Sequence, residues 1–298
     1  MLKRIESPRI FKFFRQFSKE TLFIALPLAG IVATGLFAGE DGPAVPRPSS
    51  FLPSKPATVF AEKYADPFTV QMGLSKSLDA NQFIGRIGQE IYIYRFGKGV
   101  GKGDGSVFYL GMNGHTWSLL GRTGNKFPLR AVDFLISAFL EWHSGPLSGR
   151  VNFSHISAHL GDRFSLNGRL TRQPRTYSQE FFSGILSYGT ARGTIYGGLH
   201  YFSHTIPDLK ALNFQAGGTV RLFAAAKKSW NPYFSLDLRT FGQDSYHLNQ
   251  SYQWGVRFGA LKTHAFRLAA TWYKGYSFFG QFFNERRDFV SAGFFFDY

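Results

Sequence analysis

The alternation of apolar and polar residues over long segments most limits what this chain can fold into. In "LNFQAGGTVRL" (212–222), Leu212, Phe214 and the residues in phase with them are mostly apolar, whereas the residues between them are mostly polar. A period of two residues is typical of a β-strand with one apolar and one polar face. The same pattern recurs in "SYQWGVRFGA" (251–260) and "AVDFLISAFLEW" (131–142), and it predicts an all-β protein.

About twelve such segments follow one another between Phe68 and the C-terminus. Many have ten residues or more, which exceeds the ~5–6 residues of an average globular strand and matches the ~9–11 residues of a tilted membrane-spanning strand. The segment 106–120 has a second interpretation, two short strands that turn at Asn113-Gly114. The predicted strands are 68–76, 86–96, 106–120, 129–143, 147–157, 177–189, 192–202, 211–223, 231–241, 250–260, 264–274 and 287–298.

The connections between these strands alternate in length. Short connections at 144–146, 190–191 and 261–263 alternate with longer ones, such as 158–176 and 275–286. Membrane barrels have short periplasmic turns and longer external loops, and a closed barrel is the β-structure that leaves no free strand edge in lipid. We therefore predict a transmembrane antiparallel β-barrel of about twelve strands over 68–298, with both of its ends on the periplasmic side.

The N-terminus has the layout of a signal peptide. Six basic residues and two acidic residues lie in the first twenty positions, and an apolar segment at 21–38 follows them. This order predicts an exported chain whose signal peptide, residues 1–38, is removed near Ala38. Because the apolar segment approaches the ~20 residues of a spanning helix, an uncleaved anchor is the alternative. Residues 39–67 contain six of the thirteen prolines and predict a flexible lead-in.

Charge and composition exclude several classes of partner. The formal net charge is +15, but part of it belongs to the signal peptide, and we expect no nucleic-acid partner. The chain has no cysteine, which excludes disulfides, thiolate metal sites and a lipoprotein anchor. Two histidine pairs, His155/His159 and His200/His204, have a spacing of four residues, which corresponds to ~13 Å along a strand. We therefore expect no metal site and no cofactor.

The C-terminal segment "VSAGFFFDY" (290–298) keeps the alternation and ends on an aromatic residue. It resembles the terminal signal of bacterial outer-membrane β-barrels, and this resemblance implies outer-membrane localisation and recognition by the barrel-assembly machinery. Aromatic residues near strand ends are expected to form interfacial girdles. The candidates are Tyr92, Trp117, Trp142, Tyr188, Trp254 and Trp272.

One strand carries a histidine and a serine on its apolar face. His155 and Ser157 are in phase with Val151 and Phe153, so their Cα atoms lie about 6.6 Å apart on one face. Glu180 has the apolar phase of the next strand. It lies near the start of that strand, at the same height in the barrel as His155 and Ser157. A nucleophile, a base and an orienting acid are the groups that acyl transfer needs. On the outside of a barrel, such a site fits a lipid substrate.

This His-x-Ser arrangement resembles outer-membrane phospholipase A and the outer-membrane lipid A deacylases. The resemblance implies a lipid-ester hydrolase with Ser157 as nucleophile, His155 as base and Glu180 in the place of the polar residue on the next strand. The loop 158–176 adds four arginines, whose guanidinium groups suit the phosphates of a lipopolysaccharide or phospholipid headgroup. The alternative is a solvated basic loop. These arginines are Arg163, Arg169, Arg172 and Arg175.

A broader resemblance covers most of 68–298. "RVNFSHISAHLGDRF" followed by "TYSQEFFSGILSYG" is similar to an uncharacterised family of exported bacterial barrels, a domain of unknown function. The resemblance implies the barrel fold and the location, without an activity. In the family pattern an acidic residue follows Gly-Asp, whereas this chain has Arg163, so no role of that acid carries over.

A different class of function is a channel or a structural barrel. In this interpretation the polar phases of the strands line the lumen, as they do in porins. The sequence leaves open whether the lumen is open or filled by side chains. The predicted lumen-lining residues are Asn213, Gln215, Thr219, Arg221 and Arg257.

Overall fold

The computed structural model describes residues 50–51, 60–97, 105–161, 165–166, 169–170, 172–224, 229–259 and 265–297. The predicted signal peptide and its removal near Ala38 lie outside these residues. Among the residues that are described, no helix is long and apolar enough to cross a membrane.

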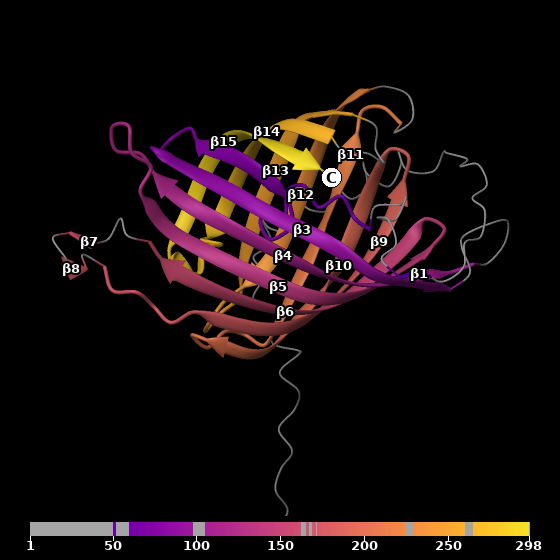
Figure 1. Cartoon of the computed structure of the whole chain (residues 1–298), viewed down its shortest axis with the longest axis horizontal. Coiled ribbons are helices and arrows are strands. Elements are labelled where there is room, and N and C mark those ends of the chain that lie inside the picture. Colours follow the sequence, from indigo (N-terminus) through magenta and orange to yellow (C-terminus); the bar gives the residue numbers. More distant parts are fainter. Residues whose placement is uncertain are drawn as a thin grey trace, which may run out of the picture. The chain divides into compact units, whose positions relative to one another are not determined.

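Twelve antiparallel strands form one closed ring (Figure 1). Each pairs with the next along the chain, and the last pairs with the first, so that the sheet has no open side. The strands are β2 (Met72–Ser77), β3 (Gln82–Gly97), β4 (Val107–Gly121), β5 (Leu129–Ser144), β6 (Leu147–Leu160), β9 (Ser178–Thr190), β10 (Gly193–Ile206), β11 (Leu212–Arg221), β12 (Trp230–Phe241), β13 (His247–Phe258), β14 (Ala265–Tyr276) and β15 (Arg286–Asp297).

Three short strands lie outside the ring. β1 (Ser50–Phe51) pairs with β3 at Arg95 and Tyr94. β7 (Ser165–Leu166) and β8 (Arg169–Leu170) form a small hairpin in the connection between β6 and β9. The prediction of an all-β antiparallel barrel of about twelve strands is confirmed.

The prediction of one strand over 106–120 is confirmed, and its alternative, two short strands that turn at Asn113-Gly114, is wrong. β4 is one continuous strand through this dipeptide, because it is paired on both sides, with β3 and with β5, and has no freedom to form a turn. One predicted boundary is wrong. β2 begins at Met72 instead of Phe68, since the preceding residues turn into the lumen of the barrel.

The two ends of the barrel differ in their connections. At one end, which we call the turn end, β5 and β6 are joined by 145–146, and β9 and β10 by 191–192. Gly145 has a φ of +56° in the first of these turns, a conformation that a glycine adopts without strain. At the other end, the loop end, the long connections 161–177 and 277–285 join β6 to β9 and β14 to β15.

The outer face of the barrel is apolar and the inner face is largely polar. A belt of this kind is the lipid-facing surface of a transmembrane barrel. Trp117 and Tyr92, predicted to lie in interfacial girdles, are instead buried in the lumen, because each has the inward phase of its strand. Exposed members of the outer belt include Ile87, Ile91, Leu110, Phe134, Ile136, Val151, Phe153, Phe182, Leu186 and Leu268.

The connection between β14 and β15 closes the lumen at the loop end. It contains the 3-10 helix η2 (Gly280–Phe282), whose residues are buried. Phe278, Phe279 and Phe282 pack there against inward side chains of the wall, Trp117 and Ile156 among them. We call residues 277–285 the cap.

A second segment, residues 60–71, lies inside the lumen, and we call it the inner segment. The Ser148 hydroxyl donates to the Phe60 carbonyl over 2.8 Å, and the Ala65 N–H donates to the Ser235 hydroxyl over 3.2 Å. We predicted a flexible lead-in throughout 39–67, but residues 60–67 are fixed by these contacts. The prolines predict a flexible segment, but groups such as Asp66 in this part of the lead-in are buried.

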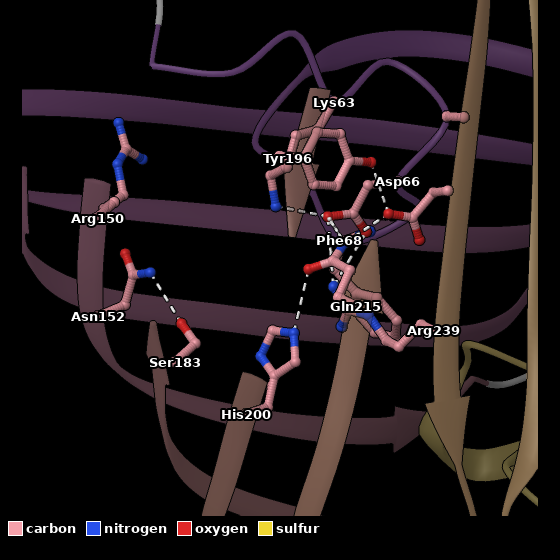
Figure 2. Close-up of polar contacts among 12 residues, drawn as sticks. Lys63, Asp66, Phe68, Arg150, Asn152, Ser183, Tyr196, His200, Gln215 and Arg239 are labelled. Carbon is pink, nitrogen blue, oxygen red and sulfur yellow. Dashed lines mark hydrogen bonds and ion pairs between the residues drawn. The ribbon is translucent and has the colours of Figure 1, made fainter. Parts of the chain in front are cut away.

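Asp66 is the centre of the contacts between the inner segment and the wall (Figure 2). Its carboxylate accepts hydrogen bonds from Gln215 over 3.0 Å, from Lys63 over 2.7 Å and from Arg239 over 3.3 Å. Burial alone would raise the pKa of the Asp66 carboxyl, but the charges of Lys63 and Arg239 and the hydrogen bonds from Lys63 and Gln215 hold that pKa below its usual value. Asp66 is therefore ionised at neutral pH.

The packing beneath the cap predicts a strong effect of Trp117→Ala. Trp117 is 0% exposed, so its loss should leave a cavity and lower the free energy of unfolding by about 3–5 kcal/mol. The matched control is Trp254→Ala, since Trp254 is 44% exposed on the outer belt and its loss leaves no internal cavity. Urea titrations read by the mobility of unheated protein on gels measure both. Equal midpoints for the two variants would contradict the assignment of Trp117 to the packed lumen.

Candidate functional site

His155 and Ser157 lie on the outer face of β6, near the loop end. Ile156, between them, is buried in the cluster beneath the cap, and this packing determines which face its neighbours take. The strand ends at Leu160, so Ser157 lies about 10 Å below the end of the strand. Ser154 has the opposite phase, and its hydroxyl bonds to Ser137 over 2.9 Å inside the barrel.

The register between β6 and β9 brings Glu180 beside His155. These two residues are direct cross-strand partners, and the His155 Nδ1 lies 2.9 Å from the Glu180 Oε1. The next outward pair toward the loop end is Ser157 and Ser178. The Ser178 hydroxyl donates to the same Glu180 oxygen over 3.1 Å, so the carboxylate is oriented by two groups.

The hydrogen bond to Glu180 leaves the other ring nitrogen of His155 available. A neutral imidazole that donates from Nδ1 to a carboxylate has an unprotonated Nε2, which can accept a proton. Within the described part of the chain, the Ser157 hydroxyl makes no hydrogen bond to this ring or to another side chain. Bonds between nucleophile and base are often long before substrate binds, and the i, i+2 spacing on one face permits this one.

Apolar side chains surround this polar group on the outer face. Phe134 and Ile136 on β5 are the register partners of Ser157 and His155. Phe153 and Phe182 lie on the side toward the turn end, with ring centroids 4.9 Å apart. The side chains of His155 and Glu180 are 42% and 26% exposed, so the pair is open to the medium that contacts the belt.

A second histidine, His204, approaches Glu180 from β10. An extra residue, Ser203, interrupts the pairing of β10 with β9 between Phe202 and His204. Phe202 packs inward, and the bulge turns His204 outward, where its Nε2 lies 3.9 Å from the Glu180 Oε2. His204 was not predicted as a site residue, because regular alternation puts it in the inward phase with His200. A β-bulge shifts that phase, and the sequence of this segment does not predict a bulge.

The four predicted headgroup arginines have different surroundings. Arg163 lies outside the described residues, and Arg169 lies in β8, where its side chain is not described. The Arg172 guanidinium donates to Glu285 over 2.7 Å, and the Arg175 backbone N–H donates to the Gln281 side chain over 2.9 Å. The guanidinium groups of Arg172 and Arg175 also lie over Phe282 and Phe283. Both arginines therefore attach the β6–β9 connection to the cap.

The residues predicted to line the lumen are buried on the inner face. Several are bonded to the inner segment: Gln215 to Asp66, Thr219 to the Glu62 carbonyl and Arg221 to the Glu62 carboxylate. The inner segment therefore contacts the wall of the lumen along β11. The five residues are Asn213, Gln215, Thr219, Arg221 and Arg257.

Among the side chains that the structure describes, no group of three or more histidine, aspartate or glutamate residues is arranged to hold a metal ion. The two histidine pairs have different geometries. His155 and His159 lie on the outer face of β6, whereas His200 is buried beside Gln215 and His204 lies outside.

A family model described as "Protein of unknown function (DUF1207)" matches residues 74–298. The chain belongs to this family. No curated protein matches it. Among solved structures, it is similar to outer membrane phospholipase A from Escherichia coli, at 12% identity and a TM-score of 0.49, over 80% of this chain and 95% of that one. An active-site mutant of the same enzyme matches at 12% identity and a TM-score of 0.47, over 79% and 95%. At this identity neither comparison assigns an activity.

The buried ion pair between Glu62 and Arg221 joins the inner segment to the wall, and we predict that it contributes to the free energy of unfolding. Both side chains are almost fully buried, so Arg221→Met should leave an uncompensated carboxylate and cost about 3–5 kcal/mol of unfolding free energy. The double variant Glu62→Gln, Arg221→Met should recover part of this loss. Urea titration measures each variant.

A control for this pair is Lys274→Met. Lys274 and Asp288 form an exposed pair on the barrel surface, with a 3.9 Å separation, and such pairs contribute about 1 kcal/mol or less. Equal losses for Arg221→Met and Lys274→Met would show that Glu62 is solvated, and the inner segment would then lie outside the lumen.

Proposed function

We propose that this protein is a lipid-ester hydrolase whose Ser157, His155 and Glu180 act on the outer face of the barrel. The observation that carries the proposal is the 2.9 Å contact between the His155 Nδ1 and the Glu180 Oε1 on an apolar, outward surface. Isolated polar groups are costly in such a place unless they are paired or used. A carboxylate that orients an imidazole next to a serine is the arrangement of hydrolases that form an acyl-enzyme.

The reaction follows from the positions of these groups. As the Ser157 oxygen forms a bond to the ester carbonyl carbon, its proton passes to the His155 Nε2. The ester C–O bond then breaks, and the imidazolium gives its proton to the leaving alcohol. Water, deprotonated by the same nitrogen, hydrolyses the acyl-serine and releases a fatty acid. Glu180 stabilises the imidazolium that forms in each half of the reaction.

The substrate enters from the side. Phe134, Ile136, Phe153 and Phe182 form an apolar surface around the polar group, and acyl chains can lie along it. The ester bond of a phospholipid or of lipopolysaccharide would then reach Ser157 near the end of the strand. Arg172 and Arg175 are engaged with the cap, and their contact with a lipid headgroup remains a prediction.

The cellular setting follows from the same proposal. The apolar belt fits the outer membrane, the N-terminal segment directs export, and the C-terminal strand is the element that the barrel-assembly machinery would recognise. The loop end, with the 161–177 connection, would face the outside. Outer-membrane lipids are then the partners of the site.

The alternative function is a channel or a structural barrel. The contents of the lumen bear on the channel. Contacts of the inner segment with Gln215, Thr219 and Arg221 occupy the polar interior, and the cap packs over the loop end. This filling disfavours a permanently open pore. A structural barrel without catalysis is the competing function, and it predicts no ester hydrolysis.

Substitution at the site tests the proposal directly. Ser157→Ala should abolish release of fatty acid from phospholipid or lipopolysaccharide micelles, and His155→Ala should be comparably damaging, because the pair acts as a unit. Glu180→Ala should have a milder effect, since an orienting acid contributes less. The measurement is fatty acid released by purified protein that keeps its heat-dependent gel mobility.

Two serines serve as matched controls. Ser154→Ala should remain active, because Ser154 faces the lumen. Ser178 shares the outer face and bonds to Glu180, so Ser178→Ala should reduce activity without abolishing it. Full loss in Ser178→Ala with an active Ser157→Ala would reassign the nucleophile. A wild type that releases no fatty acid from any bilayer lipid would overturn the hydrolase proposal.

The histidine on β10 is predicted to have a smaller effect. His204 is 59% exposed and lies 3.9 Å from Glu180, and an exposed pair of this kind contributes about 1 kcal/mol or less, which is under tenfold in rate. His204→Ala should therefore lower kcat/KM by less than about tenfold. A loss as large as that of His155→Ala would make His204 the base in place of His155.

A further inference from the structure

An arginine inside the barrel forms no salt bridge with any described residue. Arg86 projects from β3 into the lumen and is 8% exposed. Among the described residues, no carboxylate forms an ion pair with it, no hydrogen bond joins it to another group, and its buried Nε has no acceptor. Its guanidinium group lies over the face of the Phe278 ring, 5.7 Å from the centroid. The nearest carboxylate charge that acts on it, Asp66, forms no salt bridge with it and is shared with Lys63 and Arg239. A buried charge in this state is costly unless something compensates for it.

The guanidinium group lines a small cavity between the wall and the inner segment. The cavity has a volume of about 20 Å³, which is room for one or two water-sized occupants. Three serines of the wall, Ser75, Ser251 and Ser291, line it together with Arg86. All three are buried. Four residues that carry hydrogen-bond donors therefore line one space.

The side-chain acceptors around the same cavity are already used. The Asp66 carboxylate accepts from Lys63, Arg239 and Gln215. The Gln253 carbonyl oxygen accepts from Tyr233 over 2.7 Å. Because the carboxylate and amide acceptors are engaged, the cavity favours an occupant that accepts hydrogen bonds from the hydroxyls and the guanidinium group. The charge of Arg86 favours a negative occupant.

Neighbouring side chains complete this environment. The Thr271 hydroxyl oxygen accepts from the Gln253 amide over 3.0 Å, which leaves its own O–H free to donate. Arg267, a second buried arginine, lies close by, and it is paired with Asp297 over 2.9 Å. These groups add hydrogen-bond donors and a paired cation to the Arg86 site.

We propose that this cavity binds one monatomic anion of the size of chloride. Arg86 supplies the charge, and Ser75, Ser251 and Ser291 supply hydroxyl donors. The volume is too small for phosphate or for a lipid headgroup. The site joins β2, β3, β13 and β15 around the point where the ring closes, and its function is to compensate Arg86 when the barrel folds over the inner segment. The site is independent of the proposed esterase activity.

The location of the anion is tested by crystals of the folded full-length protein in sodium bromide. Bromide replaces chloride and is identified by its anomalous scattering. The expected result is a peak in hydrogen-bond contact with the Arg86 guanidinium and at least one of the three serines. A cavity that contains only water, with no anomalous peak, would overturn the proposal.

Its contribution to stability is tested by unfolding in solution. In sodium chloride the midpoint should be about 3–6 °C higher than in sodium gluconate of equal ionic strength, for an anion at about ten times its Kd. Arg86→Met should remove the difference, and Arg122→Met, at an exposed loop position, should keep it. If Arg86→Met does not fold, the double variant Ser251→Ala, Ser291→Ala should reduce the difference. Equal midpoints of the wild type in the two salts would overturn the proposal.

Discussion

Closure of the hydrogen-bonded ring is the constraint on which the rest of this structure depends. Once β15 pairs with β2, every strand has neighbours on both edges and no backbone edge is left for lipid to solvate. Closure also divides each strand into residues that face out and residues that face in. The outer set is a belt of apolar side chains, and many polar groups of the inner set are buried and need hydrogen-bond partners inside the barrel.

Inside the barrel, other segments of the same chain pair with the inward polar groups or pack against the wall. The inner segment brings Glu62 and Asp66 to the cationic and amide groups of β11 and β12, and the cap brings phenylalanines to the loop end. Among the described residues, Arg86 is a buried cation that these contacts leave without a salt bridge, and the anion that we propose would compensate it. The interior of the barrel thus contains packed segments of the chain, whereas its outer wall has the apolar belt of a membrane barrel.

The outside carries a polar group of a different kind. His155, Ser157 and Glu180 lie in the apolar phase of their strands, and the cross-strand register between β6 and β9 brings the imidazole and the carboxylate into contact. The bulge at Ser203 adds His204 from the other side. On a membrane barrel this group would face lipid, which is why we propose a lipid ester as its substrate class.

The sequence by itself determined the barrel, its strand number and the outward phase of His155, Ser157 and Glu180, because a two-residue period assigns faces without knowledge of the neighbours. It did not determine the contact between His155 and Glu180, which needs the register, or the outward turn of His204, which needs a bulge. The burial of residues 60–67 and of Trp117 was also decided by the tertiary structure. Closure creates an interior whose occupants come from distant parts of the chain, and local periodicity contains no information about them.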